Sequence, residues 1–194
     1  LLSTIPTATL PAWSSFLTSA SPSQHGVVDL FVRTKGTYSL TPGSGVLRQL
    51  PTFAWHLSRQ GYRVCSLGVP GTYPPEPLKG LCVSGFDSPS ANEAGPEAVA
   101  PLSAFSQVKE AGGWGYNVFN EHQSTTEHLR GAADSILRDL SQKEKTILSL
   151  LSGTAWDLFM VHLQASDTAA HHFWHWHDEE SPRRPDEIPL DALT

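Results

Sequence analysis

Two short apolar runs, each preceded by a helical stretch that ends at a glycine, constrain the fold of this chain most strongly. Residues 51–60, PTFAWHLSRQ, begin with proline and place apolar side chains on one helical face, and Gly61 ends the helix. The following run, YRVCSLGV (62–69), is short and rich in residues that favour buried strands. A second helical stretch closes at Gly153 and leads into WDLFMVHLQ (156–164). Helix, glycine and buried strand in this order are typical of an α/β sheet.

The helical stretch before the second run is long. Its apolar residues form two stripes at helical spacing, one over residues 129–140 and one over residues 147–151. Sequence spacings typical of a capping box begin at Ser124 and again at Ser141. We therefore expect two helices or one broken helix, and we assign both stripes to the core.

The loop after the first predicted strand, PGTYPPEPLKG (residues 70–80), carries four prolines and cannot form regular structure. It leaves the carboxyl end of a strand, which is where open α/β sheets bind their ligands. Thr72 and Tyr73 are therefore candidates for contact with a substrate. A plain connecting loop is the alternative.

Composition limits the domain organisation and the class of partner. The chain has 194 residues, 39% of them hydrophobic, which suits one globular domain over residues 1–194. A formal charge of −6 without a Lys/Arg cluster argues against a nucleic-acid groove. It remains compatible with a small phosphorylated substrate held by metal. No apolar run approaches the length of a membrane-spanning helix.

The chain termini and the cysteines bear on completeness and location. The chain begins at Leu1 rather than Met and stops at Thr194 in a polar run, so we expect that the sequence is truncated at both termini. A signal peptide can then be neither seen nor excluded. Cys65 and Cys82 make no disulfide framework, and Cys65 lies in an apolar run as an expected buried free thiol. This favours a cytoplasmic location and leaves the oligomeric state open.

Thr9 stands just ahead of a predicted helix near the amino terminus. Pro11 suits the first turn of that helix, apolar side chains recur at helical spacing, and Ser21-Pro22 ends it. The unpaired N–H groups and the dipole at a helix N-terminus attract an anion, so a hydroxyl there is placed to attack a bound phosphate. The alternative is that Thr9 only helps to begin the helix.

An Asp-x-x-x-His pair, Asp167 and His171, follows the second predicted strand at the start of a helix. A carboxylate and an imidazole are ligands of Zn²⁺, and a spacing of four places both on one helical face. A pure N-cap role for Asp167 is the alternative. The neighbouring His172, His175 and His177 alternate with aromatic residues and lack the zinc-protease pattern His-Glu-x-x-His. We expect these three at the surface or facing a partner.

Three blocks stand in order along the chain: TATLPAWSSFLTSASPSQHG, GYRVCSLGVPGTYPPEPLKGLCVSGFDSP and WDLFMVHLQASDTAAHHFWHWHD. Together, from about residue 4 to about residue 181, they resemble the type I phosphodiesterase/nucleotide pyrophosphatase family of the alkaline phosphatase superfamily. The similarity is greatest to a prokaryotic branch with the loop Val-Pro-x-Thr-Tyr-Pro-Pro-Glu-Pro. It implies an α/β three-layer sandwich with a mostly parallel central sheet, alkaline phosphatase-like, of which residues 1–194 are a part incomplete at both ends.

The resemblance also implies roles for particular residues. Thr9 falls on the family's nucleophile, which is also a metal ligand, and Asp167 and His171 fall on a pair that binds one of two metals. The implied cofactors are two divalent ions, zinc or alternatively manganese, and the implied reaction is hydrolysis of phosphate mono- or diesters. The family's other ligands fall before Leu1 and beyond Thr194, so we expect the full-length protein to be active and this chain alone to be inactive.

Departures from the family pattern leave alternatives open. The family's usual glycine after the nucleophile helix is Ser19, and Leu30 stands where nucleotide pyrophosphatases place a phosphate-binding Asn, which argues against nucleotide substrates. A phosphomutase-type transferase is an alternative with the same nucleophile. A sulfatase is not supported, because the motif Cys/Ser-x-Pro-x-Arg does not occur. A truncated, non-catalytic binding module is the alternative outside enzymes.

Overall fold

A four-stranded sheet forms the centre of the computed structural model, which describes residues 2–89, 93–116 and 126–184. Its strands lie in the order β5–β4–β3–β6. They span Val64–Val69 (β3), Gly80–Ser84 (β4), Val99–Ala100 (β5) and Leu158–Val161 (β6). β3 pairs in parallel with both β4 and β6, whereas β5 runs antiparallel to β4. The expected α/β fold with a mostly parallel sheet is confirmed.

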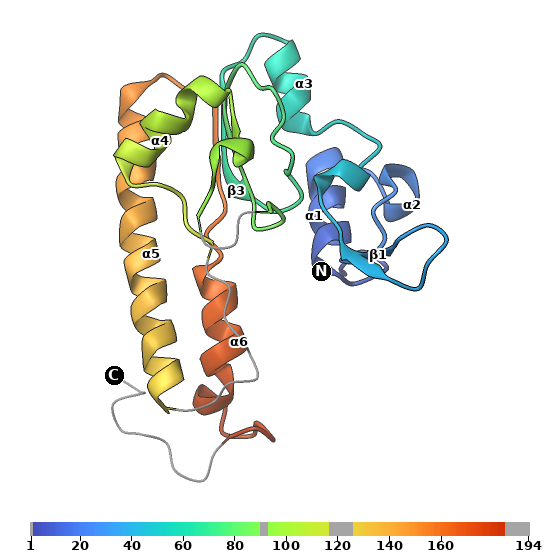
Figure 1. Cartoon of the computed structure of the whole chain (residues 1–194), viewed down its shortest axis with the longest axis vertical. Coiled ribbons are helices and arrows are strands. Elements are labelled where there is room, and N and C mark those ends of the chain that lie inside the picture. Colours follow the sequence, from blue (N-terminus) through green and yellow to red (C-terminus); the bar gives the residue numbers. More distant parts are fainter. Residues whose placement is uncertain (1, 90–92, 117–125, 185–194) are drawn as a thin grey trace.

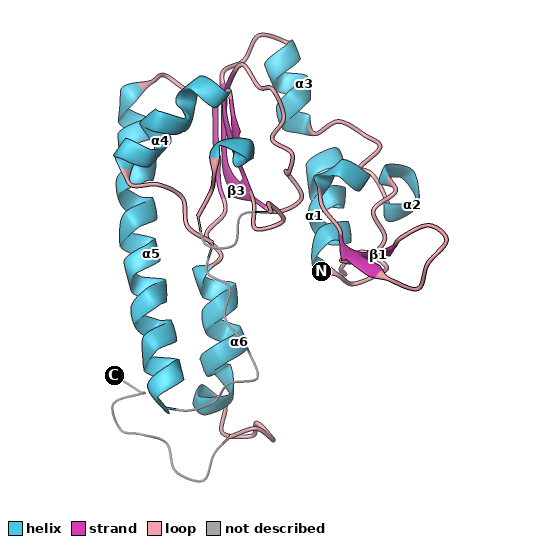
Figure 2. Ribbon diagram, viewed as in Figure 1, coloured by secondary structure: helices cyan, strands magenta, loops and turns pink. Residues whose placement is uncertain are grey.

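Helices cover both faces of this sheet (Figures 1 and 2). α4 (Phe105–Ala111) and α5 (Thr126–Gly153) lie on one face, and α3 (Phe53–Arg59) lies on the other. Both predicted helix–glycine–strand units are present, α3 before β3 and α5 before β6. β6 is an edge strand and only partly buried, so the expectation of a second buried strand is wrong. Every residue of β3 is buried, as a central parallel strand requires.

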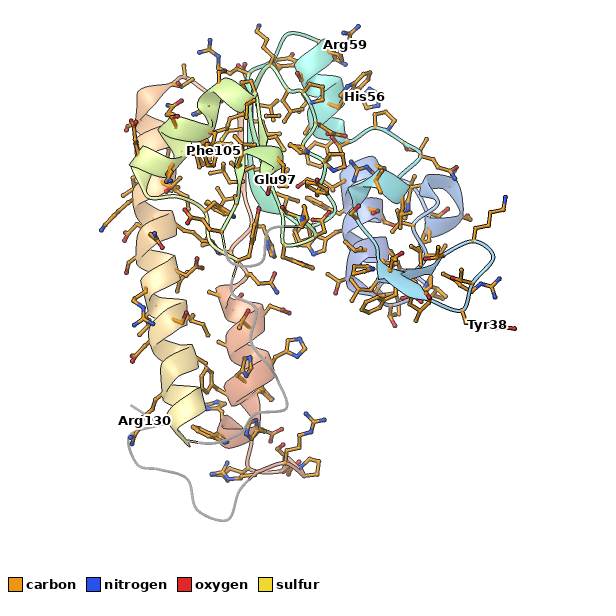
Figure 3. All side chains as sticks on the ribbon, in the orientation of Figure 1. Tyr38, His56, Arg59, Glu97, Phe105 and Arg130 are labelled. Carbon is orange, nitrogen blue, oxygen red and sulfur yellow. The ribbon has the colours of Figure 1, made fainter. Side chains whose placement is uncertain are left out.

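The amino-terminal part adds two helices and a hairpin beside the sheet (Figure 1). These elements are α1 (Thr9–Thr18), α2 (Pro22–His25), β1 (Phe31–Arg33) and β2 (Leu40–Pro42). β1 and β2 pair antiparallel, and Tyr38 at their connecting turn points away from the molecule (Figure 3). α1 ends at Ser19, whose φ of 55° is left-handed and explains why a glycine would suit that position.

α5 differs from the expectation of two helices or one broken helix, because it runs without interruption from Thr126 to Gly153. Ser141 lies inside it and caps nothing, while Ser124 lies outside the described residues. The buried side chains form one continuous stripe at helical spacing: Ala132, Ile136, Asp139, Lys143, Thr146 and Leu150. This stripe differs from the two predicted ones, because Leu137, Leu148 and Leu151 are exposed; the assignment of both apolar stripes to the core is therefore wrong. The charges of the Asp139 and Lys143 side chains neutralise each other in an ion pair, with Lys143 Nζ 2.6 Å from Asp139 Oδ2.

The chain passes from β6 into α6 (Ala165–His177), which lies beside α5 (Figure 1). Three short 3₁₀ turns complete the described elements: Gly45–Leu47, Pro96–Ala98 and Leu102–Ala104. Among the described helices, none combines the length and the hydrophobicity that crossing a membrane would require.

Candidate active site

The carboxyl ends of β3 and β6 lie side by side and are shaped by Gly68. This residue has a φ of +69°, and the register of β3 shifts between Leu67 and Val69. A Cβ on Gly68 would lie 2.5 Å from Nε1 of Trp114, so only glycine fits beneath the indole ring. The strand is therefore irregular at this point, just before the proline-rich loop begins.

α1 presents Thr9 at its first residue. Thr9 is exposed, and the N-cap position belongs to Ala8, with no side-chain cap hydrogen bond. The structure thus gives the Thr9 hydroxyl no capping role. Leu10 and Leu17 are buried and anchor the helix. Trp13, one turn after Thr9, packs edge-on against the ring of His162 at a centroid distance of 4.9 Å.

The proline-rich loop follows β3 as predicted, but its two candidate residues differ in exposure. Thr72 is buried, and its hydroxyl donates to the Val69 carbonyl at 2.6 Å and accepts from the Gly85 amide at 3.1 Å. That hydroxyl therefore holds the loop in shape, which agrees with the connector alternative. Tyr73 is only partly buried. Contact of either residue with substrate stays a prediction.

A partly buried carboxylate, Asp87, ties this loop to the preceding part of the chain. It accepts backbone N–H bonds from Gly71 at 3.0 Å, Tyr73 at 3.0 Å and Gly45 at 3.2 Å. Burial raises the pKa of Asp87, and the three hydrogen bonds oppose that shift without cancelling it. Asp87 lies in a block quoted for the family resemblance, but nothing in its local spacing singled it out.

A second tie runs through Arg48, whose side chain is 5% exposed. Its guanidinium donates to the Gly71 carbonyl and, at 3.1 Å, to Glu76 Oε1. Glu76 also accepts a hydrogen bond from the Thr52 hydroxyl. The loop is therefore held by buried charged groups on both sides, and such groups are stable only when they are paired like this.

Asp167 and His171 lie one turn apart on α6. His171 Nε2 is 3.8 Å from Asp167 Oδ1, and both side chains are more than half exposed. Asp167 is not the N-cap, because Gln164 occupies that position and donates from Nε2 to Asp167 Oδ2 at 2.5 Å. The pair has the ligand types and the spacing for one side of a zinc site. Among the described residues, however, no group of three or more His, Cys, Asp or Glu side chains could hold a metal ion.

The three neighbouring histidines differ in environment. His172 is 4% exposed, so the expectation that it faces solvent is wrong. It lies on the buried side of α6 together with Trp176, because a helix that packs on α5 must bury one face. His175 is partly buried, and burial lowers its pKa, with a smaller contribution from Arg183. His177 is exposed as expected.

Two further histidines were not predicted from the sequence. His162 directly follows β6, where it was read only as part of an apolar run. His25 is fully buried, pairs with Ser15 Oγ at 2.9 Å and accepts from the Val27 amide at 3.1 Å. Burial and the nearby Arg48 charge lower the pKa of His25. His25 therefore joins α1 to α2.

Comparison with known proteins supports the resemblance found in the sequence. The model of the family described as type I phosphodiesterase/nucleotide pyrophosphatase matches residues 1–188 of the 194-residue chain. Neither the curated proteins nor the solved structures give a significant match. The family assignment therefore depends on this one match, which covers almost the whole chain.

Proposed function

This chain belongs to the type I phosphodiesterase/nucleotide pyrophosphatase family, and from that premise we propose a metal-dependent hydrolase of phosphate mono- or diesters with Thr9 as its nucleophile. Family membership itself supports phosphodiesterase-type hydrolase activity. The observation that carries the finer proposal is the placement of Thr9. Its hydroxyl is exposed on the first residue of α1 and is not used as a cap.

The start of α1 is suited to a phosphate group. The first turn of a helix has N–H groups without intrahelical acceptors, and the first such bond here runs from Ala12 to the carbonyl of Ala8. The amides of Thr9 and Leu10 therefore remain for an anion, since Pro11 has none. A phosphate bound there would lie beside the Thr9 hydroxyl.

The proposed reaction has two steps at Thr9. The Thr9 hydroxyl loses its proton to solvent as its oxygen forms a bond to phosphorus. The bond from phosphorus to the leaving oxygen breaks, and the leaving group departs with that electron pair and takes up a proton from solvent. Water then attacks the phosphothreonine, which releases phosphate or a phosphomonoester and returns the Thr9 hydroxyl. Divalent metals, when bound, supply positive charge that stabilises the attacking and leaving oxygens.

Asp167 and His171 would hold one of these ions, and Thr9 would contribute a further ligand. A zinc ion takes about four ligands, so these three side chains are too few for two ions. We therefore propose that the site requires ligands beyond the described residues. We also propose that these further ligands lie outside the 194 residues, so that the chain alone binds zinc weakly and has slow turnover. Manganese is the alternative cation.

The substrate is proposed to be a small phosphoester that is not a nucleotide. Leu30 supplies no polar side chain where a phosphate-binding Asn would be expected, and its backbone carbonyl already accepts from Gly43 at 2.7 Å. Tyr73, on the loop held by Asp87, is the proposed contact for the organic part of the substrate. Thr72 would act through the shape of the loop, because its hydroxyl is already bonded to the backbone.

The proposal is tested by Thr9→Ala in the full-length protein, assayed with a chromogenic phosphodiester and added Zn²⁺ or Mn²⁺. Loss of a covalent nucleophile is expected to lower turnover by at least ~10³-fold. Thr7→Ala is the matched control, since Thr7 is an exposed threonine two residues before α1.

Near-normal activity of Thr9→Ala combined with loss in Thr7→Ala would show that the nucleophile is misassigned. Transfer of phosphate between two positions of one substrate, without hydrolysis, would favour a phosphomutase. Absence of any metal-dependent turnover in the wild-type protein would favour a binding module. Fast turnover by the 194-residue chain alone would contradict the proposed need for further ligands.

A further inference from the structure

His162 connects the end of the sheet to α1. Its backbone N–H donates to the Leu67 carbonyl at 3.0 Å, and its Nδ1 lies 3.2 Å from the Gly68 carbonyl oxygen. Because a carbonyl only accepts, Nδ1 carries the proton in this contact. The ring meets Trp13 edge-on, with centroids 4.9 Å apart and an interplanar angle of 80°. On one side, the imidazole is therefore held by the Gly68 carbonyl at the end of β3. On its other side, it packs against Trp13 of α1.

The contact with Trp13 reaches the face of α1 that carries Thr9. Residues four apart on a helix lie one above the other, so Thr9 and Trp13 share a face. α1 is only ten residues long, lacks a side-chain cap and otherwise packs on α2 and α3. Among the described residues, the His162 ring is one contact that joins this face of α1 to the segment after β6, while Leu10 and Ser14 of α1 lie near Gly71 after β3.

Charged groups from two other helices surround His162. Burial is the largest effect and lowers its pKa, and the Lys143 ammonium on α5 lowers it further. The Gly68 carbonyl and the Asp167 carboxylate on α6 act in the opposite direction. His162 lies in the short connection between β6, which ends at Val161, and α6, which begins at Ala165 and carries Asp167. Its ring therefore joins the start of this connection to the helix that carries Thr9.

We propose that His162 is a positioning residue that sets the placement of Thr9 relative to Asp167, acting through Trp13 on one side and Gly68 on the other. This inference rests on the proposed function, in which Thr9 attacks phosphorus and Asp167 holds a metal. His162 itself takes no part in bond making. Its ring contact and its hydrogen bond together decide where α1 lies on the strand ends.

The first experiment needs no activity. Hydrogen–deuterium exchange of α1 amides is compared between the wild-type chain and His162→Ala. An aromatic pair contributes about 0.5–1.5 kcal/mol, so exchange in α1 should rise between about 2-fold and 10-fold. His56→Ala is the matched control, because His56 packs edge-on against Trp55 at 5.2 Å on α3, away from the strand ends (Figure 3). It should leave α1 unchanged.

The second experiment measures kcat and KM in the full-length protein. His162→Ala should lower kcat by roughly 10-fold, with KM and zinc content nearly unchanged, because substrate and metal ligands are all retained. His162→Phe keeps the ring contact and should recover much of the loss. In a double-mutant cycle with Trp13→Leu, the second substitution should lower kcat little beyond the first, since both substitutions break the same ring contact.

The outcomes separate this inference from the proposed function. Unchanged α1 exchange in His162→Ala overturns the positioning role, whether or not the enzyme is active. Raised α1 exchange with an unchanged kcat also overturns it, because the placement of α1 would then not matter for catalysis. An inactive wild-type protein refutes the proposed function, and the exchange experiment still decides whether His162 holds α1.

Discussion

Removal of the Asp87 carboxylate should destabilise the protein by about 3 kcal/mol or more. Asp87→Ala leaves the amides of Gly45, Gly71 and Tyr73 without their acceptor in a part-buried loop. Each unsatisfied buried polar group costs about 1–3 kcal/mol of stability. Water that enters the space left by the side chain will offset part of the total cost for the three amides. The measurement is the free energy of unfolding from urea titration at pH 7.

Asp157→Ala is the matched control for this substitution. Asp157 is exposed and accepts from one backbone amide, that of Arg63, at 2.7 Å. Its loss should cost less than ~1 kcal/mol because water replaces the carboxylate at the surface. Equal losses for the two variants, or a loss below ~1 kcal/mol for Asp87→Ala, would refute the conclusion that Asp87 organises the loop.

The raised pKa of Asp87 gives a second measurement on the same residue. The folded protein binds this proton more tightly than the unfolded chain, so the contribution to stability is greatest below the unfolded pKa of about 4. It declines as pH rises from there to the folded pKa. Asp87→Asn stays neutral, so the stability of wild type relative to this variant should fall over that range. A relative stability that rises with pH would contradict burial as the dominant cause.

Three further predictions concern the metal pair and the backbone. His171→Ala should lower zinc content in the full-length protein, measured by elemental analysis, while His175→Ala should barely change it; equal losses would favour a histidine cluster. Gly68→Ala should destabilise by more than ~2 kcal/mol in urea unfolding, because its Cβ would lie 2.5 Å from Trp114. Ser19→Gly should raise stability by roughly 0.5–1 kcal/mol by relieving the left-handed φ of 55°; a loss would mean that the serine side chain stabilises the helix end.

Local signals were sufficient where one element is specified by its own residues. Helix α3 between Pro51 and Gly61, the buried strand β3 and the proline-rich loop were all predicted from composition and periodicity. The start of α1 was predicted in the same way, because proline and helical spacing are local features. The family was recognisable because three blocks keep their order, and the match over residues 1–188 confirms it.

Features that depend on contacts with residues far away in the sequence were predicted incorrectly or not at all. The long helix α5 was expected to be two helices or one broken helix, because its apolar residues form two separate stripes and a second capping-box spacing begins at Ser141. In the structure, Asp139 and Lys143 lie on its buried face. Because the two side chains form an ion pair, they can lie on a buried face of the helix. Their burial can be recognised only when both side chains and the elements packed over them are seen together in the structure. His172 was expected at the surface for a similar reason, since its side chain type does not tell which face of α6 packs on α5.

The sequence by itself therefore determined on which kind of element the candidate residues stand: Thr9 at the start of a helix, and Asp167 and His171 on the helix that follows a strand. Only the tertiary structure decided that Thr72 is buried, that Asp87 ties the loop and that His162 lies between α1 and the strand ends. The physical reason is that helix starts and strands follow from neighbours along the chain. The environment of a side chain follows from contacts such as Trp13 with His162, which lie far apart in the sequence and meet only when the sheet has formed.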